Sequence, residues 1–346
     1  MSVPLYQQIC NDLVKEIKTN NLKVGEQLPT EKELALTYKV SRITAKRALS
    51  ELEQMGMATR IQGKGSFVTK VKKVQFSGTN RRLLFVMPFE GMNFGNFTPG
   101  LLPTINAAEI TLFMTYSNYL RENSATSIRE NFDGLIYYPM HTEDFLDVLL
   151  ELSMYNFPIV LLDKKIIDLP FPCVFADNFN GGILATHLLI QQGHQRIAYV
   201  MSNEPHHPHT TRNRYLGYIK ELKENHLSYH TTLDDPLATV EGILKLIESQ
   251  ALTGLVCEND LVALQIMGVL QQQGYSFPMD ISIIGFDNIQ ATQLSQPGLT
   301  TIAQDFQKMG QVAGEMIIDW LDHGIRPEDK KVDIQLIKRN STRDIS

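Results

Sequence analysis

The stretch VSRITAKRALSELEQMG, from Val40 to Gly56, predicts a helix whose first turns are basic. Arg42, Lys46 and Arg47 stand among small and hydroxyl residues, and a leucine-bearing stripe follows at helical spacing. Ser41, directly before them, is a residue type that caps the beginning of helices. Two interpretations fit this pattern: a basic helix that faces only solvent, or a helix that enters a DNA groove.

The residues before this stretch predict another short helix, joined to it by a tight turn. Thr30 fits an N-cap, and Glu33 three residues later completes a capping box. Further upstream, PLYQQICNDLVKEIKTNNL places apolar residues four positions apart, which marks one face of a helix. Two short helices joined by such a turn form a helix-turn-helix.

The residues after this stretch, MATRIQGKGSFVTK, predict a β-hairpin. Residues 58–61 and 66–68 have strand character, and QGKG forms the tip between them, where Gly63 and Gly65 allow positive φ. The sequence GKGS lacks the earlier glycine of a phosphate-binding loop, so a nucleotide site is excluded. A helix-turn-helix followed by a basic hairpin is a winged helix.

The distribution of charge separates this basic beginning from the rest of the chain. Residues 1–73 contain 13 Lys and Arg against 7 Asp and Glu, whereas the remainder contains 19 against 31. A basic head on an acidic body is expected when only the head contacts a polyanion. At 346 residues, with no apolar run of membrane-spanning length and no signal-peptide core, the chain is expected to be a cytoplasmic protein of two or three domains. The cysteines, Cys10, Cys173 and Cys257, are expected to be buried thiols.

The segment LPTEKELALTYKVSRITAKRALSELEQMGMATRIQGKGSFV resembles the DNA-binding domain of the GntR family of bacterial repressors along its whole length. Lys32 and Lys46 stand where the family often has arginine, and Ile43 where it often has a polar residue. Lysine keeps the charge but loses the fork geometry, so these two lysines are expected to hold phosphates. The resemblance places the DNA contacts at Lys32, Ser41, Arg42, Thr44, Lys46, Gln62, Gly63 and Lys64.

The remainder of the chain alternates apolar strand-like runs with amphipathic helical stretches. The predicted strands are LLFVMPF, ITLFMTY, DGLIYYP, PIVLLD, RIAYVMS, TGLVCE and ISIIGFD. Continuous apolar strands that alternate with helices indicate α/β architecture, with parallel sheets covered on both faces. Because so many strands exceed one small sheet, we expect two lobes.

Polar and aromatic residues follow the predicted strands, at the sheet edge where ligands of open parallel sheets bind. Hydrogen-bonding groups and aromatic rings together suit a neutral polyhydroxyl ligand, and the set contains no nucleophile–base pair. These strand-end residues are Phe89, Tyr137, Asp163, Ser202, Asn259 and Asp287.

Three segments after residue 174 are similar to the effector domain of the lac/gal repressor family, which resembles periplasmic sugar-binding proteins. They are ADNFNGGILATHLLIQQGHQRIAYV, CENDLVALQIMGVLQQQGYSFPMDISIIGFDN and LTTIAQDFQKMGQVAGEMIIDWL. The segment MPFEGMNFGNFTPGLL departs from that family, so Phe89 is assigned there by its position alone, with Asn93 and Phe94 beside it. The resemblance implies effector contacts at Tyr137, Asp163, Arg214, Asn259, Asp287, Gln304 and Phe306.

Simpler roles remain open for several of these residues. Asp163 and Asp287 can also be caps of the following loops, and Arg214 a surface ion-pair partner. The HHPH sequence invites a metal hypothesis, but no carboxylate or cysteine stands at metal-ligand spacing, so a cleft-edge loop is expected there. Trp320 is expected in the core.

Together these resemblances divide the chain into a winged helix-turn-helix domain (1–70), a linker (71–81) and a two-lobed effector domain (82–346). A GntR-type head on a lac-type body is the arrangement of the arabinose repressor class of Gram-positive bacteria. The resemblance implies a homodimeric repressor of a sugar-utilisation operon, which binds double-stranded operator DNA and is released by a small sugar. No catalytic residue, metal or cofactor is expected. A non-sugar effector, co-repression, and an enzyme with a DNA-binding head are the alternatives; the last lacks a pyridoxal-binding lysine motif.

Overall fold

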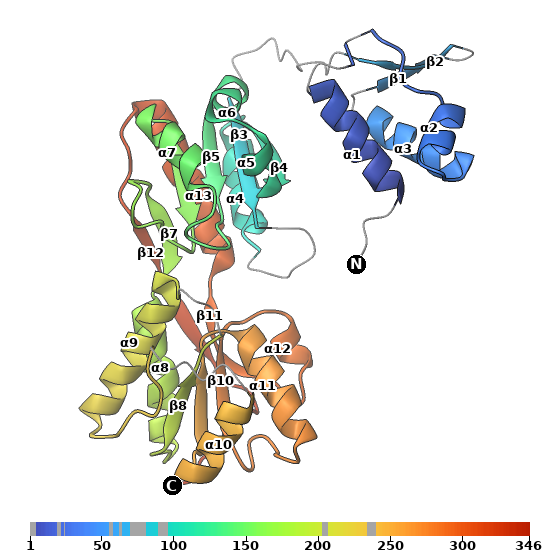
Figure 1. The fold of residues 1–346 in the computed structure, drawn as a ribbon. Helices are drawn as coiled ribbons and strands as arrows, with labels where there is room; N and C mark the ends of the chain where they lie inside the picture. The colour runs from blue at the N-terminus through green and yellow to red at the C-terminus, as the bar shows by residue number, and fades with distance from the viewer. Residues whose placement is uncertain are drawn as a thin grey trace. The chain divides into compact units, whose positions relative to one another are not determined.

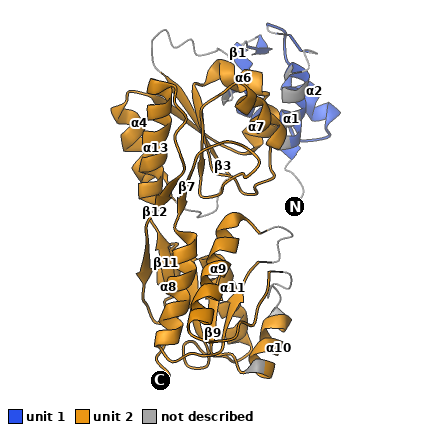
Figure 2. Ribbon diagram, turned by 90° about the vertical axis from the view of Figure 1, so that its left-hand side faces the viewer, with its two compact units in different colours: residues 1–79 blue, residues 80–346 orange. Residues whose placement is uncertain are grey.

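The chain folds into two compact units, Met1–Thr79 and Asn80–Ser346 (Figure 2). The computed structural model describes residues 5–18, 22–23, 25–54, 58–61, 64–69, 81–88, 96–202, 207–233 and 240–346. The predicted linker lies outside these residues except for its last position, so the domain boundaries stay predictions. Among the described helices, none combines the length and apolar character that a membrane span requires.

The first unit is a helix-turn-helix followed by a two-stranded antiparallel hairpin (Figure 1). The capping box predicted from the sequence is present: the Glu33 backbone N–H donates to the Thr30 hydroxyl, and the Thr30 backbone N–H donates to the Glu33 carboxylate at 2.8 Å. Buried residues that include Ile9, Leu34 and Leu52 form its core. Its elements are α1 (Leu5–Lys18), α2 (Glu31–Thr37), α3 (Arg42–Gln54), β1 (Ala58–Ile61) and β2 (Gly65–Val68).

The first lobe of the second unit is built on a six-stranded sheet in the order β12-β7-β6-β5-β3-β4, with every adjacent pair parallel. Two apolar cores lie on its two faces. Its strands are β3 (Arg82–Met87), β4 (Thr111–Tyr116), β5 (Gly134–Tyr137), β6 (Ile159–Leu162), β7 (Cys173–Ala176) and β12 (Lys330–Val332). Its helices are α4 (Thr98–Ala107), α5 (Asn118–Glu122), α6 (Ala125–Asn131), α7 (Leu146–Met154) and α13 (Phe306–His323).

The second lobe contains a five-stranded sheet in the order β13-β11-β10-β9-β8, parallel except for the antiparallel edge strand β13. The prediction of an α/β body with two lobes and parallel sheets is confirmed, and all seven predicted strands are present. Its strands are β8 (Ile197–Val200), β9 (Gly254–Cys257), β10 (Ser282–Asp287), β11 (Thr300–Gln304) and β13 (Ile334–Ile337). Its helices are α8 (Asn178–Gln191), α9 (His209–Glu224), α10 (Val240–Gln250), α11 (Asp260–Gln272) and α12 (Ala291–Leu294).

The chain passes between the two lobes three times within the described residues, and each passage contains an aspartate. Asp177 separates β7 from α8, Asp305 separates β11 from α13, and Asp333 separates β12 from β13. The first two accept hydrogen bonds from backbone N–H groups of the helices that follow them, at 3.3 and 2.8 Å. Both helices therefore begin at a capped residue immediately after the crossing.

Helices α8 and α9 of the second lobe approach each other at backbone distance. A Cβ atom at Gly182 would lie 1.9 Å from the Arg214 carbonyl oxygen, and one at Gly217 would lie 2.1 Å from the Phe179 carbonyl oxygen. Any side chain at either position would separate the helices, because backbone atoms cannot move aside as a flexible side chain can. This contact fixes the position from which the Arg214 side chain projects.

We predict that Gly182→Ala lowers the free energy of unfolding by about 1–3 kcal/mol or more, as overpacking does. Gly268→Ala in α11 is the matched control, because no atom lies within 4 Å of the added Cβ. Alanine there should stabilise the helix by about 0.5–1 kcal/mol. Urea denaturation of both variants measures the difference, and an unchanged midpoint for Gly182→Ala would contradict the close approach.

Candidate functional site

The beginning of α3 is held by a local cap. The Thr44 backbone N–H donates to the Ser41 hydroxyl oxygen at 3.1 Å, and the two hydroxyl oxygens lie 2.9 Å apart. The cap predicted at Ser41 is therefore confirmed. Both hydroxyls still stand at the N-terminal end of α3, where the helix dipole and the capped N–H groups favour an approaching phosphate.

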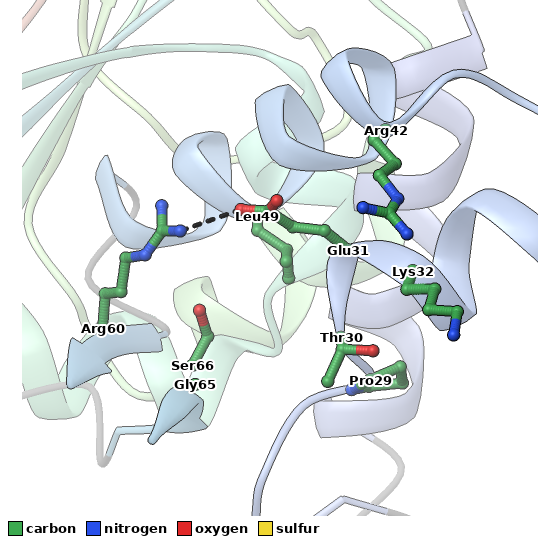
Figure 3. Close-up of a pocket in the computed structure, with 9 residues that line it drawn as sticks. All are labelled: Pro29, Thr30, Glu31, Lys32, Arg42, Leu49, Arg60, Gly65 and Ser66. Carbon is green, nitrogen blue, oxygen red and sulfur yellow. Dashed lines mark hydrogen bonds and ion pairs between the residues drawn. The ribbon is translucent and has the colours of Figure 1, made fainter. Parts of the chain in front are cut away.

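Exposed cations surround this helix end and the hairpin. Arg42 and Lys46 are exposed on α3, as is Lys32 on α2. Figure 3 shows Lys32 and Arg42 on the rim of one hollow, with Gly65 and Ser66 of the hairpin on its other side. The structure thus brings residues from α2, α3 and β2 to one surface.

Two contacts hold the hairpin against the rest of the first unit. The Arg60 guanidinium of β1 forms an ion pair with the Glu31 carboxylate of α2 at 2.9 Å, drawn in Figure 3. The Gln27 side-chain amide donates to the Lys64 carbonyl oxygen at 2.9 Å, beside Gly65 with its φ of +106°. The second contact holds the backbone of the exposed Lys64. The predicted tip residues Gln62 and Gly63 lie outside the described residues.

A second site lies in the cleft between the two lobes of the second unit. Asp163 follows β6 and Phe306 begins α13 in the first lobe, whereas Arg214 projects from α9 in the second. Six of the eight predicted effector residues line this one pocket: Asp163, Arg214, Asn259, Asp287, Gln304 and Phe306. The strand-end position Ser202 lines it too, together with residues that were not predicted, such as Tyr138, Lys164 and Glu258.

Arg214 is buried at the base of this cleft, with an exposed fraction of 6%. Its Nε donates to Asn178 Oδ1 at 2.7 Å and its Nη1 to the Glu258 carbonyl oxygen at 2.5 Å. The guanidinium lies over the Phe286 ring, 3.6 Å from its centroid, and Nη2 is 3.5 Å from Asp287 Oδ1. The alternative of a surface ion pair is therefore wrong.

The acidic side chains of the cleft are held in an unusual backbone conformation. Asp163 and Asp287 have positive φ values of 64° and 111°. Asp287 Oδ1 accepts a hydrogen bond from Gln304 Nε2 at 2.6 Å, whereas the buried atoms Asp163 Oδ1 and Gln304 Oε1 have no hydrogen-bond partner among the described residues. Burial raises the pKa of Asp287 to about 6, although the positive charge of Arg214 acts to lower it. Buried acceptors without partners suit a ligand that donates hydrogen bonds.

Asn259 and two aromatic rings complete the wall of the pocket. Asn259 Oδ1 caps α11 by accepting from the Val262 backbone N–H at 2.8 Å, which leaves its amide N–H groups as donors for a ligand. Tyr138 and Phe306 both pack edge-on against the buried Phe97 ring, at centroid distances of 5.0 and 5.3 Å. These two rings add apolar surface to the polar lining of the pocket.

One predicted effector residue is placed elsewhere. Tyr137 is buried in a core on one face of the first-lobe sheet and packs edge-on against Phe145, so the structure does not bring it to the cleft. The neighbouring Tyr138 faces the other side of the sheet and lines the pocket instead. Phe89, with Asn93 and Phe94, lies outside the described residues.

The structure gives His209, from the HHPH sequence, a role in packing. Its Nδ1 accepts a hydrogen bond from the Lys165 backbone N–H at 3.3 Å, and its ring packs edge-on against Phe175. Burial lowers the pKa of this histidine. Across the described part of the chain, no three His, Cys, Asp or Glu side chains group as metal ligands would.

Both parts of the chain match known protein families. Residues 5–68 match the bacterial regulatory proteins of the gntR family, and residues 186–342 match the periplasmic binding protein-like domain. Over 99% of both chains, the sequence is 30% identical to an arabinose metabolism transcriptional repressor of Geobacillus stearothermophilus. The chain belongs to the family of this repressor, whose members are transcriptional repressors with a gntR-type DNA-binding domain.

More distant relatives agree with this membership. The HTH-type transcriptional repressor CytR of Escherichia coli K12 is 26% identical, with 93% of this chain and 98% of that chain covered. A LacI family regulator of Enterococcus faecium with bound ribose matches 77% of this chain and all of its own, at 25% identity and a TM-score of 0.63. A CelR–cellobiose complex, 19% identical, matches 91% of this chain and all of its own at the same TM-score. The match to transcriptional repressors over nearly the whole chain confirms the predicted regulator in preference to an enzyme with a DNA-binding head.

Asp260, next to Asn259, is a fully buried carboxyl group at the beginning of α11 in this repressor. Its Oδ1 accepts from the Thr301 hydroxyl at 2.6 Å and its Oδ2 from the Ile289 backbone N–H at 2.9 Å. Burial, and next the charge of Asp287, raise the pKa of Asp260 to about 8. The folded protein therefore keeps this proton at pH values where the unfolded chain has released it.

Because the pKa of Asp260 is higher in the folded state, its contribution to stability is full below its unfolded pKa of about 4 and is lost as the pH rises towards 8. We predict that Asp260→Asn, which is neutral at every pH, shows a smaller fall in melting temperature than the wild type between about pH 5 and pH 8. Calorimetric scans at several pH values measure both slopes. Asp168→Asn, at an exposed position, is the control and should keep the wild-type slope; an unaltered slope in Asp260→Asn would contradict the raised pKa.

Proposed function

We propose that this repressor is a cytoplasmic homodimer that binds a pseudo-palindromic operator and is released from it by a neutral sugar. The observation that carries this proposal is the pocket that the Arg214–Asp287 pair lines together with the rings of Tyr138 and Phe306. A sugar presents hydroxyl groups that both donate and accept, and C–H faces that lie on aromatic rings. The groups lining the pocket are complementary to both.

The charges of the pocket favour a neutral ligand over a phosphorylated one. Asp163, Asp287 and Glu258 are acidic residues of the lining. The two cationic residues of its described lining both have partners in the protein: Arg214 has those given above, and Lys164 Nζ donates to the Met140 carbonyl oxygen at 2.6 Å. A phosphate would meet these carboxylates without an unengaged arginine to balance it. The ribose bound to the Enterococcus faecium relative and the cellobiose bound to CelR are neutral sugars.

On the DNA, we propose that the N-terminal end of α3 enters the major groove. Arg42 then reads a guanine through two donors, and Ser41 and Thr44 contact phosphates or base edges. Lys32 and Lys46 contact phosphates. The hairpin approaches the adjacent minor groove, where Gln62 and Gly63 contact the DNA and Lys64 contacts a phosphate. One α3 contacts only a few base pairs. A homodimer that binds two half-sites about 34 Å apart therefore has a higher affinity for the operator than one head alone.

Release requires that the sugar bind two conformations of the dimer with different affinity. The pocket is lined from both lobes, so a sugar that contacts both favours the closed arrangement. The three crossings at Asp177, Asp305 and Asp333 are the segments about which the lobes can rotate. We propose that closure changes the spacing of the two heads and lowers operator affinity.

We predict that Arg42 and the two lysines respond differently to substitution. Arg42→Ala should cost about 1–3 kcal/mol of operator binding and relax the preference at one base position. Lys46→Ala and Lys64→Ala should weaken binding to any DNA and lower the slope of log K against log salt by about 0.9 each. Fluorescence anisotropy on operator and scrambled duplexes at several salt concentrations separates these effects, with the ion-paired body residue Lys220→Ala as the control. A slope unchanged in Lys46→Ala and Lys64→Ala would disprove their phosphate contacts.

We predict that neutral pentoses, hexoses or disaccharides raise the melting temperature of the repressor. At a concentration 100 times the dissociation constant, the shift should be roughly 5–10 °C. Asp287→Asn and Arg214→Lys should then raise the dissociation constant of that sugar by about 10- to 100-fold in calorimetric titrations, because charged hydrogen bonds are lost. Both should bind operator as the wild type does, as should Lys220→Ala. Stabilisation by sugar phosphates or nucleosides alone would refute the sugar assignment.

A further inference from the structure

Ile43 is the most exposed large apolar side chain among the described residues, with an exposed fraction of 80%. It occupies the second position of α3, between Arg42 and Thr44. The apolar residues of α3 that build the core, Ala45, Ala48, Leu49 and Leu52, are all buried. Ile43 is therefore not part of the core that the described residues of this unit form.

The position of Ile43 along α3 places it on the outer face of the helix. Residues three and four positions apart share a face, so Ile43 lies beside Lys46 and Arg47, both of which are exposed. Isoleucine is also a weaker helix former than alanine, leucine or lysine. Helix stability and core packing thus give no reason for isoleucine here, whereas the cations on either side of it mark a surface that fits DNA.

We propose that Ile43 determines part of the operator sequence by contacting the C5-methyl group of a thymine in the major groove. This inference rests on the proposed entry of α3 into that groove. Among the four bases, thymine alone presents a methyl group at the major-groove edge, and apolar side chains recognise it by contact. Because Ile43 follows Arg42 directly, the thymine lies within a base pair or two of the guanine that Arg42 reads. In a homodimer the same thymine occurs once in each half-site.

The methyl group itself can be removed from the DNA, which makes the contact testable atom by atom. An operator is first selected from randomised duplexes with the full-length wild-type protein. Each thymine is then replaced in turn by deoxyuridine, which differs only by the methyl group. We expect one deoxyuridine position in each half-site to weaken wild-type binding about fourfold, the effect of one buried methyl group.

The matching substitution in the protein is Ile43→Ala, which should bind the thymine and deoxyuridine operators equally well while keeping the preferences at all other positions. Alanine raises helix propensity, so a loss of affinity cannot come from a weakened α3. Leu36→Ala is the control: Leu36 is 70% exposed on the adjacent helix α2, and its variant should keep the wild-type response to deoxyuridine.

The outcomes distinguish this inference from the proposed function. If the wild type selects no sequence, both fail. If it selects an operator and Arg42→Ala relaxes one base position, but no thymine is sensitive to deoxyuridine, only the role of Ile43 is overturned. Equal sensitivity to deoxyuridine in the wild type and in Ile43→Ala overturns it as well.

Discussion

The buried guanidinium of Arg214 is the group on which the cleft depends. A cation with 6% exposure requires several partners, and it finds them in Asn178, the Glu258 carbonyl oxygen, the Phe286 ring and Asp287. These partners come from α8, from the end of β9 and from β10, so one side chain connects three elements of the second lobe. The connection is possible because Gly182 lets α8 approach the backbone of Arg214 itself. The close packing of α8 against α9 therefore also determines where the positive charge of Arg214 lies in the pocket.

Much of the cleft could be predicted because parallel strands bring their carboxyl ends to one edge. Asp163 and Asn259 come one and two residues after apolar strands, Asp287 is the last residue of another, and all three line the pocket. Gln304 and Phe306 were assigned only through the family resemblance, since β11 combines threonines with few large apolar residues and gave no strand signal. The short strands β7, β12 and β13 were not predicted either; β12 has two lysines among its three residues, so it has no apolar run.

Features that depend on neighbouring residues could be predicted from the sequence, whereas contacts between distant residues could not. The caps at Thr30 and Ser41 depend on residues three positions apart, so both were predicted correctly. The assignment of Tyr137 failed because β5 is buried at all four positions, and a strand buried on both faces gives no alternation that tells one side from the other. The contacts of Arg60 with Glu31 and of Gln27 with Lys64 join residues 29 and 37 positions apart, which no local pattern reveals.

The three crossings between the lobes also affect the order in which the chain can fold during synthesis. The first lobe needs α13 and β12, which end at residues 323 and 332, and the second needs β13, which ends at residue 337. Neither lobe is complete until almost the whole chain has left the ribosome. The elements of the first unit, by contrast, all lie before residue 69 and can pack while the body is still being translated. A nascent chain can therefore present a finished head well before it has a pocket to control it.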